Sequence, residues 1–204
     1  MATRQQLWQA ARAVITSLQA IPERHQAKVI IIGGAALENH VPGYRPTRDV
    51  DILIFDRDDP NSTQAIQAEL LSSIPRQFEE RAQPIYFTGN PNHEVQVDII
   101  PPDLPPYFPA DAATLGEVDP NHLPFLAPLD LLVYKIHCCS MRPLRRKRTQ
   151  DAKDAHKLVN ILSQQGAIAL NDSQEQAVLS GLDGMLEYSG ETREWWESAL
   201  GLSG

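Results

Sequence analysis

The chain has 204 residues, 42% apolar and 22% charged, an ordinary globular composition that excludes an intrinsically disordered protein. Its formal net charge of −8 excludes a surface that attracts nucleic acid everywhere, but it is compatible with a local basic site. We expect a cytoplasmic protein without a membrane partner, because Cys138 and Cys139 cannot build a disulfide framework and no segment resembles a secretory signal or a membrane span.

In the first half, the spacing of apolar residues predicts short strands interleaved with helices. The expected helices cover residues 3–20, 35–40 and 62–73. The expected strands cover 28–32 and 50–55, followed by a hairpin of 78–88 and 94–100 whose loop is 89–92. Five prolines between residues 101 and 109 predict an extended connector.

The second half is expected to be helical, with helices over 126–141, 146–165, 172–187 and 190–200. Strands followed by a run of helices indicate an α+β fold, in which a small mixed sheet carries flanking helices. We expect residues 1–125 to form the core with its N-terminal helix. Residues 126–204 are then a helical part that packs on this core.

Basic residues are concentrated in one segment of this acidic chain. Residues 142–157 contain seven arginines and lysines and two aspartates, which gives the segment a net charge of +5. The segment is either the solvated face of a helix or a surface that an anionic ligand approaches.

The segment from Ile30 to Phe55 combines a glycine turn with paired acids. Gly33 and Gly34 follow a strand, where backbone N–H groups at the start of a helix can approach an anion closely. Asp49 and Asp51 begin the next strand, and residues two apart in a strand point to the same face. Two carboxylates at this separation repel each other unless a cation lies between them, and Mg²⁺ prefers such oxygen ligands.

A third carboxylate, Asp98, fits the same site. In the strand over 94–100, apolar residues at 95, 97 and 99 alternate with Gln96 and Asp98, so Asp98 lies on the polar face. Taken by itself, Asp98 is equally compatible with a solubilising residue on an edge strand. A dinucleotide-binding unit is set aside for two reasons. The G-x-G-x-x-G pattern requires Gly at position 35, where this chain has Ala, and no matching βαβ unit follows.

These residues resemble the nucleotidyltransferase superfamily with a DNA polymerase β-like palm, and most closely its branch of AbiEii-type toxins. Members of this branch carry a glycine pair and then Asp-x-Asp, often after Arg-x-Thr, here Arg45 and Thr47. One later helix carries a Lys, matched by Lys135, and the next carries an Arg before two aspartates. Arg148, Asp151 and Asp154 match that pattern in order. The resemblance covers residues 28–160. The chain departs from the superfamily's commoner Gly-Ser motif, because Gly34 stands in the place of the Ser.

The resemblance implies a transferase that moves a nucleoside monophosphate from an NTP, such as ATP, to a hydroxyl acceptor and releases pyrophosphate. It implies a two-ion Mg²⁺ site whose catalytic and metal-binding residues are Asp49, Asp51 and Asp98. The implied nucleotide-binding residues are Gly33, Gly34, Thr47, Lys135, Arg148 and Asp154.

Alternatives remain for these residues and for the function. Lys135, on an otherwise apolar helix, either reaches a phosphate or snorkels to solvent. Asp151 and Asp154 share a helix face with basic neighbours, so a structural ion-pair network is an alternative for both. A catalytically silent module that binds nucleotide or RNA is the alternative function. The acceptor is a tRNA, a protein or a small molecule. The basic segment favours RNA, whereas the overall acidity of the chain argues against it.

Overall fold

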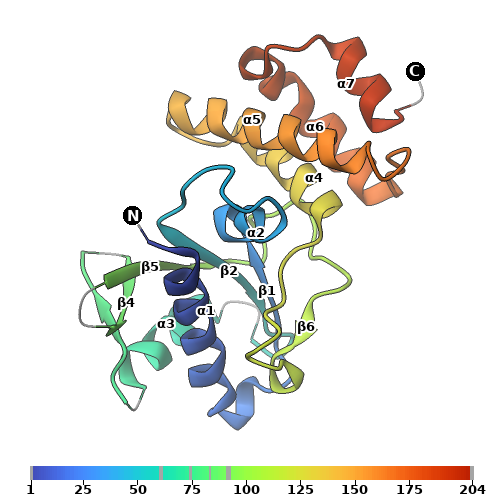
Figure 1. Cartoon of the computed structure of the whole chain (residues 1–204). Coiled ribbons are helices and arrows are strands. Elements are labelled where there is room, and N and C mark those ends of the chain that lie inside the picture. Colours follow the sequence, from blue (N-terminus) through green and yellow to red (C-terminus); the bar gives the residue numbers. More distant parts are fainter. Residues whose placement is uncertain (1, 60–61, 74, 83, 91–92, 203–204) are drawn as a thin grey trace. The chain divides into compact units, whose positions relative to one another are not determined.

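The structure is a computed structural model that describes residues 2–59, 62–73, 75–82, 84–90 and 93–202 (Figure 1). It divides into two compact units. Unit 1 comprises residues 1–104 and 109–126, and unit 2 comprises residues 105–108 and 127–204. Among the described residues, no helix has both the length and the apolar character that crossing a membrane requires.

Unit 1 is built on a mixed sheet with the strand order β3-β4-β5-β2-β1-β6. Strands β2 and β5 are parallel, and the other neighbouring strands are antiparallel. The strands are β1 (Lys28–Ile32), β2 (Asp49–Phe55), β3 (Phe78–Glu80), β4 (Ile85–Asn90), β5 (His93–Ile100) and β6 (Ala113–Thr114). The helices of this unit are α1 (Arg4–Gln19), α2 (Gly33–His40) and α3 (Thr63–Ser72). Short 3₁₀ turns cover Pro22–Arg24 and Leu115–Glu117.

The core of unit 1 lies on one face of this sheet. Apolar residues of α1 and α3 pack against alternate residues of β2 and β5, which are fully or almost fully buried. On these two strands the core positions are Val50, Ile52, Ile54, Val95, Val97 and Ile99. Because side chains alternate along a strand, the residues between these positions face the opposite side of the sheet.

Over its described residues, unit 2 contains four helices and the short inserted segment 105–108. The helices are α4 (Pro128–Cys139), α5 (Arg145–Leu162), α6 (Asp172–Ser189) and α7 (Arg193–Leu200). Helix α6 begins with a capping box in which Asn171 and Gln174 exchange side-chain and backbone hydrogen bonds. Tyr107 of the inserted segment donates a 2.6 Å hydrogen bond to Asp130 on α4, which fixes the segment to this unit.

The structure confirms the α+β class with a small mixed sheet, and it changes three local expectations. The expected strand 78–88 is two strands, because the Arg81 N–H donates to the Pro84 carbonyl and closes a turn between β3 and β4. Helix α2 begins at Gly33 rather than at residue 35. Strand β4 extends to Asn90, while Pro91 and Asn92 of the expected loop lie outside the described residues. The packing of the helical part on the core stays a prediction.

Candidate active site

Two carboxylates of the site come from the first three residues of strand β2. Asp49 and Asp51 are half-buried and flank Val50, whose side chain is fully buried in the core. Because β2 alternates between its two faces, burial of Val50 and Ile52 on the core side directs both aspartates to the opposite face. The apolar core therefore fixes the direction of the acidic pair.

The third carboxylate is supplied by the neighbouring parallel strand. Asp98 on β5 is the register partner of Asp51 on β2. One carboxylate oxygen from each of Asp49, Asp51 and Asp98 lies within 4.8 Å of the other two. The structure therefore brings together the three carboxylates that the sequence singled out.

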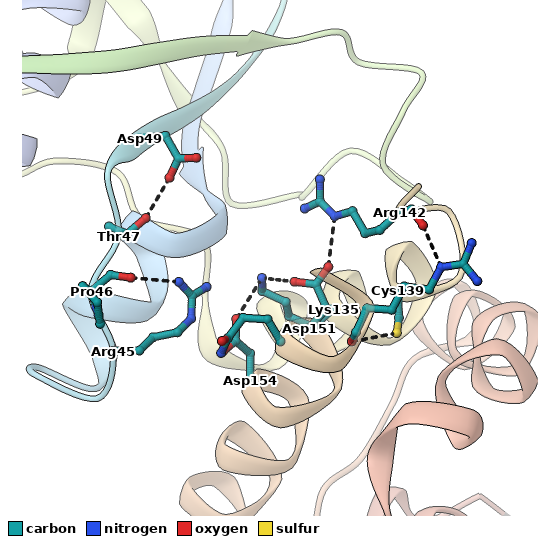
Figure 2. Close-up of polar contacts among 11 residues, drawn as sticks. Arg45, Pro46, Thr47, Asp49, Lys135, Cys139, Arg142, Asp151 and Asp154 are labelled. Carbon is teal, nitrogen blue, oxygen red and sulfur yellow. Dashed lines mark hydrogen bonds and ion pairs between the residues drawn. The ribbon is translucent and has the colours of Figure 1, made fainter. Parts of the chain in front are cut away.

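Neutral donors hold two of these carboxylates. Thr47, a buried residue just before β2, donates a 2.8 Å hydrogen bond from Oγ1 to Asp49 Oδ1 (Figure 2). Gln96 on β5 donates from Nε2 to both carboxylate oxygens of Asp98, at 3.0 and 2.9 Å. Sequence reasoning placed Gln96 on the polar face of its strand but did not include it in the site. The signal was its position two residues before Asp98.

The glycine turn lies directly against the carboxylates. Gly33 has a φ of +66°, and a Cβ atom at this position would lie 1.9 Å from Asp51 Oδ2. A Cβ atom on Gly34 would lie 2.4 Å from Thr47 Oγ1. Any larger residue at either position must displace a site residue, so the glycine pair sets how closely the start of α2 approaches the acidic cluster.

The donor set of this cluster suits a hard divalent cation. Three carboxylates a few ångströms apart repel one another, and a cation among them turns the repulsion into attraction. Mg²⁺ binds carboxylate oxygens, typically one or two from the protein together with waters and substrate phosphates. Asp49, Asp51 and Asp98 would hold such an ion.

Two of the residues predicted in the C-terminal half, Lys135 and Asp154, contact each other within unit 2. Lys135 on α4 lies 2.5 Å from Asp151 Oδ1 and 3.0 Å from Asp154 Oδ2, both on α5 (Figure 2). All three side chains are buried, and Asp154 is fully so. Arg142, which sequence reasoning missed as a partner, donates to Asp151 Oδ2 at 3.0 Å. These contacts give Lys135, Asp151 and Asp154 a structural role in joining α4 to α5.

Arg148 contacts a different part of unit 2. Its Nε donates a 2.6 Å hydrogen bond to the Arg142 carbonyl, and its Nη1 donates to the Tyr188 hydroxyl at 3.2 Å. Its own carbonyl accepts from Cys139 Sγ at 3.3 Å. Burial raises the pKa of this thiol to about 11. Arg148 thereby fixes the loop between α4 and α5 to α6.

The family model "Nucleotidyl transferase AbiEii toxin, Type IV TA system" matches residues 18–180 of this chain. The chain belongs to the AbiEii nucleotidyltransferase family. The match includes every site residue that the sequence predicted, from Gly33 to Asp154. Helix α7 lies beyond the part that the AbiEii model matches.

A solved structure has the same fold as this AbiEii-family chain. It is the crystal structure of an antigenic nucleotidyltransferase-like protein from Paracoccidioides brasiliensis, with a TM-score of 0.63 and 21% sequence identity. The similarity covers 97% of this chain and 93% of that chain, so it extends over both units. No curated protein matches the chain significantly.

Proposed function

We propose that the protein is a Mg²⁺-dependent nucleotidyltransferase that moves a nucleoside monophosphate from an NTP, such as ATP, to a hydroxyl acceptor. One observation carries this proposal: three carboxylates from two parallel strands lie within 4.8 Å of one another beside a glycine turn. Membership of the AbiEii family supports the general reaction class. The charge and spacing of the carboxylates support the metal.

In the proposed reaction, the acceptor oxygen attacks the α-phosphorus of the NTP and forms a new P–O bond. The bond from the α-phosphorus to the bridging oxygen breaks, and pyrophosphate leaves with that electron pair. The acceptor hydroxyl passes its proton to the carboxylate of Asp98, which acts as the general base. Bound Mg²⁺, as one or two ions, would supply charge neutralisation for the phosphates and the leaving group.

The residues around the carboxylates would position the nucleotide. Gly33 and Gly34 begin α2, where backbone N–H groups face an approaching phosphate without side-chain obstruction. Thr47 holds Asp49 through a 2.8 Å hydrogen bond, so it orients a metal ligand. We retain Lys135, Arg148 and Asp154 as proposed nucleotide-binding residues, although each also has the structural contacts within unit 2 described above.

An exposed basic surface in unit 2 favours RNA as the acceptor. Arg142, Arg145, Arg146 and Lys147 are all exposed, and the last three form the first turn of α5. Basic side chains are electrostatically unfavourable at a helix N-terminus, so an anionic partner would relieve this repulsion. The neighbouring Leu144 is 49% exposed, although it is apolar. A protein hydroxyl and a small molecule are the other acceptor classes to be tested.

The free cysteines support a cytoplasmic location.

The test is to incubate the protein with α-³²P-labelled NTPs, Mg²⁺ and fractionated cell extract, and to follow label transfer and pyrophosphate release. We expect label in the RNA fraction, and loss of transfer with EDTA or in Asp49→Asn. Label in protein or in small molecules would overturn the RNA assignment and keep the transferase. NTP binding that requires Mg²⁺ but yields no pyrophosphate with any fraction would instead identify a catalytically silent module.

A further inference from the structure

Gln96 occupies a position between the acidic cluster and the next strand of the sheet. It precedes Asp98 by two residues on β5, so both side chains lie on the same face. Its register partner on β2 is Asp49, and its register partner on β4 is Tyr86. Gln96 is therefore next to two of the three carboxylates, one along its own strand and one across to the next.

The contact between Gln96 and Asp98 involves both carboxylate oxygens. Gln96 Nε2 lies 3.0 Å from Asp98 Oδ1 and 2.9 Å from Oδ2. An ionised carboxylate only accepts hydrogen bonds, so the –NH₂ end of the amide must face it. A donor shared by the two oxygens limits rotation of the carboxylate about its Cβ–Cγ bond.

We propose that Gln96 is a positioning residue that fixes the Asp98 carboxylate for cation binding and transfer. This role rests on the function proposed above. A neutral amide orients Asp98 without cancelling the negative charge that attracts the cation, whereas Lys or Arg at this position would cancel it. Thr47 does the same for Asp49 with a hydroxyl donor. Substitution of a residue that orients a metal ligand in this way typically lowers metal affinity or activity by about 10–100-fold.

The test uses Mn²⁺ as a spectroscopic substitute for Mg²⁺, with Kd measured by electron paramagnetic resonance on the full chain. Gln96→Met keeps the side-chain length and removes the donor, and Gln96→Asn keeps the amide but shortens its reach. We expect both variants to weaken Mn²⁺ binding at least about tenfold. In the transfer assay we expect kcat to fall by a similar factor, with KM for the NTP nearly unchanged. The control is Gln64→Met, at an exposed position on α3, and it should match the unmodified protein.

The outcomes separate the two proposals. If the unmodified protein does not bind Mn²⁺, the metal-dependent function itself fails. If it binds Mn²⁺ and both Gln96 variants bind equally well or more tightly while they remain folded by circular dichroism, the positioning role is overturned. If Gln96→Met does not fold, Gln96→Asn decides the question. A rise in KM with unchanged kcat would also overturn the role, because it would place Gln96 in nucleotide binding.

Discussion

Lys135 and Asp154 form an ion pair of 3.0 Å in the interior of unit 2, where the aspartate side chain has no exposure to solvent. Asp151 completes the cluster at 2.5 Å from the same ammonium. One buried cation thus stands between two buried carboxylates. Loss of that cation leaves two carboxylates close together in a region of low dielectric constant, although Arg142 still contacts Asp151.

Lys135→Met should therefore destabilise the protein strongly. We expect the free energy of unfolding to fall by about 3–5 kcal/mol, the range for breaking a buried ion pair by removing one partner. Urea denaturation followed by circular dichroism measures this change. The control is Lys147→Met, an exposed site on the same helix as the aspartates, which should change stability by less than about 0.5 kcal/mol. A loss below about 1 kcal/mol in Lys135→Met would mean that the ammonium is solvated.

Substitutions at Gly33 and Gly43 distinguish the effect of backbone strain from the effect of contact with the site. Both have positive φ, +66° and +74°, so Ala at either position adopts a left-handed conformation that costs about 1–2 kcal/mol. A Cβ atom on Gly43 would meet nothing within 4 Å, whereas one on Gly33 would lie 1.9 Å from Asp51 Oδ2. Gly33→Ala should therefore lose Mn²⁺ binding, and Gly43→Ala should retain it. Equal Mn²⁺ affinities in the two variants would show that Asp51 can move away from the added Cβ atom without loss of metal binding.

The adjacent thiols should be unreactive in the folded protein. Burial raises the pKa of Cys138, and it raises that of Cys139 from 9.0 to about 11. At pH 9 we expect slow reaction with a thiol reagent in native buffer, and fast reaction of two thiols in urea. Because the folded chain keeps the Cys139 proton that the unfolded chain loses, stability should fall as the pH rises from 9 to 11. Cys139→Ala should show a smaller decline over this interval. An equal decline in Cys139→Ala would show that other groups cause the loss of stability.

Local pattern was sufficient to predict part of the site. The period of two along a strand placed Asp49 and Asp51 on one face, and the apolar alternation around Asp98 placed it on the polar face of its strand. The glycine turn followed from the strand before it. These are properties of single segments, so the sequence contains them directly.

The rest depends on contacts between segments. The register that pairs Asp51 with Asp98 is set by packing of β2 against β5, and no pattern within either strand specifies it. The burial of Lys135 depends on where α5 presents its two aspartates, so the sequence left both snorkelling and phosphate binding open. By contrast, the turn that divides the expected strand 78–88 is local: the Arg81 N–H donates to the Pro84 carbonyl, and Pro84 interrupts the run that the prediction treated as one strand.

Asp98→Asn should improve stability while it removes function. Three carboxylates within 4.8 Å repel one another in the metal-free protein, and replacing one with a neutral amide of the same shape relieves about 1 kcal/mol or more of that repulsion. For a chain of this size, about 1 kcal/mol corresponds to a rise in Tm of about 2–4 °C without metal.

The same substitution removes a metal ligand and the proposed general base. Added Mg²⁺ with NTP should therefore raise the Tm of the unmodified protein but not that of Asp98→Asn, and transfer should be lost. Asp103→Asn, an exposed acid just beyond β5, is the matched control and should keep both the Mg²⁺-dependent shift and the activity. A metal-free Tm that falls in Asp98→Asn would mean that its hydrogen bonds from Gln96 outweigh the repulsion. A Mg²⁺-dependent shift that survives in Asp98→Asn would mean that Asp49 and Asp51 hold the ion without it.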